Sequence, residues 1–200
     1  MINSENYVEK LLLSHGPIRP AELLTREQYE SIRPELLAVG LEHKKQRRAR
    51  LNESLTLLLE SRVTIWLQIH EELRWLAKPS KSETAEILKT NNLIAPCAEN
   101  LTGTIFIDGS DSKIVHEYVR ALNQNTLAID LIIDGWTYSA APIGGQSINN
   151  DVIHSRKFFR NHRSSDVDQV RMMGDKVAEF TPRIGPSAKR KCFVKSIPVI

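Results

Sequence analysis

The sequence has few cysteines, and those two lie far apart. Cys97 follows a proline and Cys192 lies in a basic, strand-like run, and neither belongs to a CxxC motif. This pattern favours two reduced thiols over a disulfide framework. It also excludes a tetrahedral zinc site built from cysteines within one chain.

Long apolar runs, aromatic residues and excess charge are also scarce. No run reaches the roughly 18 apolar residues that span a bilayer, and the N-terminus lacks the basic start of a secretory signal. We therefore expect a cytoplasmic protein without membrane contact. Aromatic residues make up 6%, and the net charge is only +3 with 27 basic and 24 acidic residues interspersed, which disfavours a dedicated nucleic-acid surface. With 41% hydrophobic residues the chain can form a substantial core.

The sequence also lacks the common signatures of catalysis. It contains no GxGxxG or GxxxxGK[ST] loop, and the GGQS at 144–147 lacks the strand-to-helix context of a phosphate site. No Ser, His and Asp set forms a recognisable nucleophile elbow. The residues therefore identify no catalytic group and no cofactor.

Residues 53–76 form the most informative stretch. The apolar run Leu55–Leu59 predicts a buried strand, and Ser61 predicts the N-cap of a helix that Pro79 ends. The apolar face of this helix repeats every three or four residues and consists of Ile65, Ile69, Leu73 and Leu76.

A polar row follows the same predicted helix. Thr64, Gln68, Glu71 and then Arg74 or Trp75 are also three or four residues apart, so their side chains share one face. Such a row can line a site in which an arginine fork holds a carboxylate or phosphate and Glu71 acts as a base. The candidate ligand-binding residues are Arg33, Glu60, Thr64, Gln68, Glu71 and Arg74. The alternative is an ordinary solvated face, on which a Glu71–Arg74 pair contributes roughly 0.2–0.5 kcal/mol.

His70 and Glu71 are weak candidates for metal ligands, with Glu60 before them and His154 and His162 as further donors from the sheet. The HEEL segment is not HExxH, and adjacent helical side chains point about 100° apart, which disfavours one shared ion. The simpler interpretation is a partly exposed histidine.

Residues 43–51 are the most basic segment, and Lys44, Lys45, Arg47 and Arg48 are candidates for phosphate contacts. Basic residues also gather at helix C-termini, where they complement the helix dipole, and a strand edge with Arg48 and Arg50 on one side can follow. Because no aromatic residues interleave as a stacking surface, the helix-end interpretation is favoured.

The remaining patterns predict an α+β fold in which several helices pack on one face of an antiparallel sheet. Residues 1–24 read as a loosely attached N-terminal extension and 25–200 as one domain. Thr25 and Gln28 predict a capping box, and Pro34 predicts a break between a turn at 26–33 and a helix from 34 to about 46. The other predicted helices are 82–90, capped by Ser82, then 111–123 and 165–173, and the other predicted strands are 102–108, 127–133, 136–140, 152–159, 177–183 and 191–199. Asp134-Gly135 marks a hairpin turn, and a flexible loop is expected at 142–151.

The stretch from Arg26 to Arg74 contains Tyr29, Ile32, Arg33, Glu35, Asn52, Leu55, Thr56, Leu57, Leu58, Glu60, Thr64, Gln68, Glu71, Leu73 and Arg74. Through these residues it resembles the N-terminal half of the bacterial proteins grouped as domain of unknown function 3501. Residues 91–108 and 152–159 resemble later segments of that family. The family's activity is not established, but its genes tend to lie beside those for rubrerythrin-like and iron-sulfur proteins. The resemblance therefore implies a redox or peroxide-defence setting.

Three functions remain open. The favoured one is an accessory or interaction protein that serves a redox metalloprotein of rubrerythrin or iron-sulfur type. The second is an enzyme or small-ligand binder with a polar pocket on the helix at 61–78. The third is nucleic-acid binding through residues 44–50. A buried Glu60 or Glu71 would favour the second, since a desolvated carboxylate must be paired or change its pKa.

Overall fold

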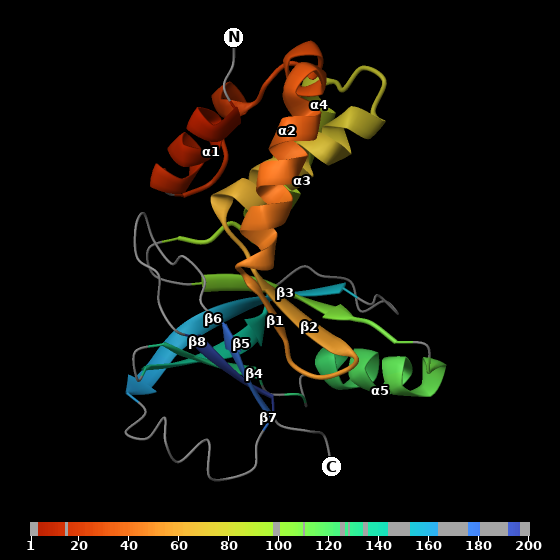
Figure 1. Cartoon of the computed structure of the whole chain (residues 1–200). Coiled ribbons are helices and arrows are strands. Elements are labelled where there is room, and N and C mark those ends of the chain that lie inside the picture. The colour runs from red at the N-terminus through yellow and green to blue at the C-terminus, as the bar shows by residue number, and fades with distance from the viewer. Residues whose placement is uncertain are drawn as a thin grey trace. The chain divides into compact units, whose positions relative to one another are not determined.

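The computed structural model divides the chain into two compact units, shown in Figure 1. The helical unit consists of Met1–Lys45 and Glu60–Ala98, and the sheet unit consists of Gln46–Leu59 and Glu99–Ile200. The structure describes residues 4–14, 16–97, 101–109, 111–124, 127, 129–133, 136–143, 153–163, 176–180 and 192–196.

The described residues of the helical unit form four α-helices and a short 3-10 helix. They are α1 (Ser4–Leu13), η1 (Pro20–Glu22), α2 (Arg26–Lys45), α3 (Arg62–Trp75) and α4 (Lys81–Asn92). Their core centres on Trp66, which is fully buried, and on the apolar side chains around it, Leu36, Val63, Ile65 and Ile69. The predicted helix after Leu59 is thus confirmed as α3.

Side-chain caps fix where these helices begin. Ser61 accepts a hydrogen bond from the Thr64 amide, as predicted, and Thr25 and Gln28 form the predicted capping box. The cap of α4 was predicted at the wrong serine. Ser80 caps it instead. The Ser80 side chain accepts a hydrogen bond from the Glu83 amide, and the Glu83 carboxylate accepts one from the Ser80 amide.

The predicted break at Pro34 is wrong, because α2 is one helix with Pro34 inside it. Its buried positions, Tyr29, Ile32, Leu36 and Gly40, keep a spacing of three or four residues across the proline. A proline within a helix costs roughly 3 kcal/mol. Packing of this uninterrupted face offsets the cost.

Residues 1–24, predicted as an extension, contribute three buried side chains to the helical core: Val8, Leu11 and Ile18. The predicted boundary between an extension at 1–24 and a single domain at 25–200 stays a prediction.

Within the described part of the chain, no helix is both long and apolar enough to cross a membrane.

In the sheet unit, the residues that the structure describes form an eight-stranded antiparallel sheet with the order β1-β2-β3-β6-β5-β4-β8-β7. The expected α+β class is confirmed. The strands are β1 (Arg48–Arg50), β2 (Leu55–Leu59), β3 (Leu101–Ile107), β4 (Ile129–Ile133), β5 (Trp136–Pro142), β6 (Ile153–Arg163), β7 (Lys176–Phe180) and β8 (Cys192–Ser196). The predicted hairpin is present, since Ile133 pairs with Trp136. Its turn, the predicted helix at 165–173 and all but two residues of the predicted loop at 142–151 lie outside the described residues. Pro142, predicted as the first residue of that loop, is the last residue of β5.

The sheet curls until β1 contacts β7, and its inner face carries the core. Alternate residues of β2 face inward together with Ile105 of β3, and α5 (Ser112–Asn123) adds Val119 and Leu122. Gly103 allows this close packing, because a Cβ there would lie 2.9 Å from a methyl group of Leu57 and 3.2 Å from the backbone oxygen of Leu58.

Candidate ligand-binding site

Glu71, the candidate base, is held by two side chains of α2. Arg33 donates from Nε and Nη2 to its two carboxylate oxygens, each at 2.8 Å, and the Tyr29 hydroxyl donates to Oε1 at 2.7 Å. The hydrogen bonds from Arg33 lower the pKa of Glu71, and burial with the bond to Glu71 raises the pKa of Tyr29. Glu71 is therefore an ionised structural partner and a poor proton acceptor.

The other members of the polar row bind separate partners. Arg74 donates from Nε to Glu30 at 2.6 Å, and the exposed Gln68 donates to Glu72 at 3.1 Å. Thr64 donates to Glu60, which is 5% exposed. The structure therefore joins Arg33 with Glu71 but does not bring all six candidates into one site.

His70 is buried, in contrast to the partly exposed histidine that the sequence suggested. Its Nε2 accepts from the Leu24 amide at 3.1 Å, so Nδ1 carries the proton and donates to the Trp66 carbonyl at 2.9 Å. Burial lowers the pKa of His70 to about 4. Both nitrogens are thus used, and the described residues contain no group of three or more side chains placed to hold a metal.

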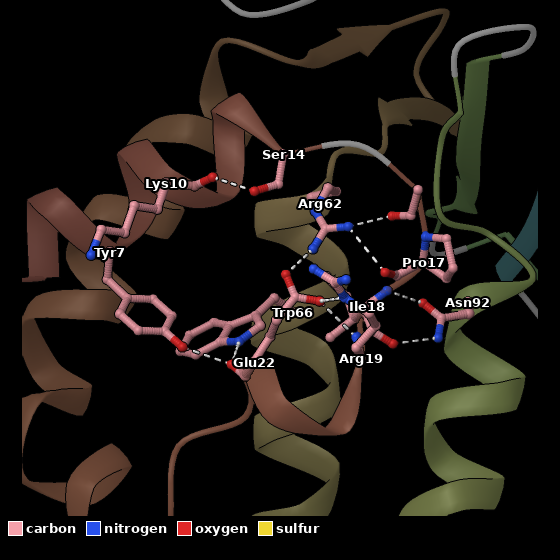
Figure 2. A network of polar contacts seen from close by, with 11 residues as sticks. Tyr7, Lys10, Ser14, Pro17, Ile18, Arg19, Glu22, Arg62, Trp66 and Asn92 are labelled. Atoms are coloured by element: carbon pink, nitrogen blue, oxygen red, sulfur yellow. Dashed lines mark hydrogen bonds and ion pairs between the residues drawn. The ribbon is translucent and has the colours of Figure 1, made fainter.

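Arg62 fixes the segment at residues 16–24, here called the strap, to α3 (Figure 2). Its Nη1 donates to the carbonyls of Gly16 and Pro17, and its Nη2 forms an ion pair with Glu22. The indole of Trp66 donates to the Glu22 carbonyl at 2.9 Å. These contacts span 40 to 46 residues of sequence. The sequence contained no signal for them beyond an arginine at the start of an apolar helix.

Asn92 of α4 holds the strap from another side. Its side-chain oxygen accepts from the Ile18 amide at 2.7 Å, and its nitrogen donates to the Ile18 carbonyl at 2.9 Å (Figure 2). The Tyr7 hydroxyl of α1 donates to the Glu22 carbonyl at 2.7 Å. The strap is therefore fastened to three helices.

The strap, the start of α2, the end of α3 and the region around α4 line a partly open pocket of about 300 Å³. Its lining is mainly apolar, with His70 in the wall. Of the predicted ligand-binding residues, Arg74 alone is among the described lining residues. Arg26 also lines the pocket, but it was not predicted as a ligand-binding residue. The lining consists of Pro20, Leu23, Leu24, Thr25, Arg26, Tyr29, His70, Leu73, Arg74, Pro79 and Thr84.

The basic segment is divided between two elements, because α2 ends at Lys45 and β1 starts at Arg48. Arg47 is buried, and its Nε donates to the Leu59 carbonyl at 2.8 Å. Lys45 pairs with Glu42 at 3.2 Å. Arg48 lies over the Phe106 ring, 5.5 Å from its centre. At least Arg47 is thus committed to a structural role.

The fold and the pocket define an α+β protein with an antiparallel sheet and a helical unit that carries a small, mainly apolar pocket. The chain belongs to the family described as Protein of unknown function (DUF3501), whose model matches residues 17–179. This confirms the resemblance found in the sequence. No curated protein matches the chain at a significant level.

A solved structure with a similar fold is that of a novel protein of unknown function from Burkholderia pseudomallei K96243. The match has a TM-score of 0.64 and 19% sequence identity, and it covers 88% of this chain and 91% of the other. At this identity the likeness supports the fold alone.

Proposed function

We propose that this protein binds a small molecule in the pocket of the helical unit. The main support for this proposal is the pocket itself. Its volume of about 300 Å³ lies at the lower end of the range of about 300–1,000 Å³ typical of ligand sites. Its walls come from residues 20–29, 70–74 and 79–84, which are far apart in sequence and are brought together by the fold.

Hydrogen bonds within the walls support a pocket that exists before a ligand arrives. The Leu24 amide is bound to His70, and Arg26 donates to the carbonyls of Leu76 and Ala77 at the end of α3. A wall held in this way loses little conformational entropy when a ligand binds.

A variant that fills the pocket tests the proposal. Thr84 of α4 lines the pocket, whereas its neighbour Ala85 is exposed and is not among the lining residues. We expect Thr84→Trp to abolish binding of small apolar probes, measured by ligand-observed NMR, and Ala85→Trp to leave it unchanged. Equal binding by both variants, or binding by neither the wild type nor Ala85→Trp, would contradict the proposal.

An accessory role is the second candidate, and the side chain of Trp75 supports it. Trp75 is 81% exposed at the end of α3, and exposed tryptophans are enriched in protein interfaces. The family resemblance suggests a redox metalloprotein of rubrerythrin or iron-sulfur type as the partner, in the cytoplasm. We expect Trp75→Ser to weaken binding to such a protein from the same host in titration calorimetry. Leu41→Ser, at a 61% exposed position of α2, is the control.

A further inference from the structure

The interior of the pocket offers few polar partners to a ligand. The Tyr29 hydroxyl already donates to Glu71, and both nitrogens of His70 are already bound, to Leu24 and Trp66. A carbonyl or other hydrogen-bond acceptor of a ligand, buried against these two side chains, would lose its water without gaining a hydrogen bond, because their donors are already used. The body of the ligand is therefore apolar. The apolar walls are Pro20, Leu23, Leu24, Leu73 and Pro79.

The volume of the pocket sets the size of that body. Water occupies about 30 Å³ per molecule in the liquid, so a pocket of about 300 Å³ holds roughly ten groups of that size. This corresponds to a chain of about eight carbons with a small head group, or to one substituted aromatic ring.

Charge in the lining is positive. The charged residues that line the pocket in the described part of the chain are Arg26 and Arg74, and the described lining residues contain no acid. Arg26 donates from Nη1 to the carbonyls of Leu76 and Ala77, each at 3.1 Å. A guanidinium has five N–H groups, so Nε and Nη2 remain to bind an anion.

The charge of Arg26 is also less compensated than that of Arg74. The partners of Arg26 Nη1 are neutral carbonyls, whereas Arg74 donates to the carboxylate of Glu30 at 2.6 Å. The carboxylate of Glu27 interacts electrostatically with Arg26 but is solvated and does not line the pocket. An anionic head at Arg26 therefore gains a charged partner in the wall of a mainly apolar pocket.

We infer that the ligand is a small amphipathic carboxylic acid, of about the size of octanoate, with its hydrocarbon in the pocket and its carboxylate on Arg26. This inference depends on the proposed ligand-binding function and specifies the ligand's chemistry. Arg74 is the neighbouring cation, and Glu30 keeps it in place.

Titration calorimetry with three matched probes tests the inference on the full chain: octanoate, 1-octanol and octylammonium. We expect octanoate to bind at least tenfold more tightly than 1-octanol, since one charge-assisted hydrogen bond is worth roughly that factor. Octylammonium should bind more weakly than either. Arg26→Gln should reduce octanoate affinity about tenfold and leave 1-octanol affinity unchanged.

Lys10→Gln is the matched control, because Lys10 is an exposed cation of the same unit that does not line the pocket. It should change no affinity. Thermal unfolding of Arg26→Gln checks that the end of α3 remains folded, and unchanged 1-octanol binding shows that the cavity is intact.

The outcomes separate the two proposals. If octanoate and 1-octanol bind equally and Thr84→Trp blocks both, the carboxylate inference is wrong and the ligand-binding function stands. Tighter binding of octylammonium would likewise overturn the inference alone. If no probe binds wild type, or Thr84→Trp does not reduce binding, both proposals fail.

Discussion

His70 should make the helical unit less stable as the pH falls from about 7 to about 4. Its pKa is 6.5 when exposed and about 4 in the fold, because burial disfavours the charged ring. Between these values the unfolded chain binds a proton that the folded chain does not, so the free energy of unfolding decreases as pH falls. At about 1.4 kcal/mol per pH unit, the loss amounts to roughly 3 kcal/mol. Below about 4 both states are protonated and the loss stops.

The assay is urea unfolding followed by far-UV circular dichroism at a series of pH values, for wild type and His70→Gln. Glutamine does not titrate, and its side-chain oxygen can accept from the Leu24 amide. The stability difference between the two proteins should shrink by roughly 3 kcal/mol from pH 7 to pH 4. Carboxylates such as Glu71 titrate in both proteins and cancel. Parallel pH profiles, or a His70 ring that titrates near 6.5 by NMR, would refute the reasoning.

Three further predictions concern the strap, the polar row and the sheet. Arg62→Met should lower the free energy of unfolding by roughly 3 kcal/mol and expose the strap to protease, because it leaves Glu22 without its buried cation. Glu71→Gln should cost only about 1 kcal/mol, because Glu71 and Arg33 are about 30% exposed and water screens the pair. Gly103→Ala should destabilise the sheet unit by roughly 1–3 kcal/mol through overpacking. Denaturant unfolding measures all three.

Matched variants control these measurements. Arg19→Met removes an arginine that is 77% exposed, and Glu86→Gln removes a carboxylate that is 67% exposed, so both should be nearly neutral. Gly109→Ala places a methyl group at ordinary contact distance, 3.4 Å from Val115, and should be tolerated. A strap variant as stable as its control, or Gly103→Ala as mild as Gly109→Ala, would contradict the packing described above.

Local signals predicted the start of the central helix well, because the groups involved are close in sequence. Leu55–Leu59 and the Ser61 cap were confirmed as β2 and the start of α3. The cap of α4 was predicted at Ser82, but the sequence contained the signal for the correct residue. Ser80 and Glu83 have capping-box spacing, whereas Ser82 has no acid three residues later. The predicted break at Pro34 was wrong because tertiary packing of α2 outweighed the local cost of a proline.

The site was less predictable, because its contacts join distant segments. His70 is buried and accepts a hydrogen bond from Leu24, 46 residues earlier, and Arg33 binds Glu71 across 38 residues. Helical spacing correctly showed that polar side chains follow α3 but could not reveal the partners of each. The pocket depends on the strap, whose attachment through Arg62 has no sequence signature.

Binding of a small ligand in the helical unit is the central claim, and amide chemical-shift mapping with octanoate tests it most directly. We predict saturable shifts at Leu24, His70, Leu73 and Thr84, present in Ala85→Trp and absent in Thr84→Trp. Shifts confined to residues outside the pocket, or identical shifts in both tryptophan variants, would contradict the account.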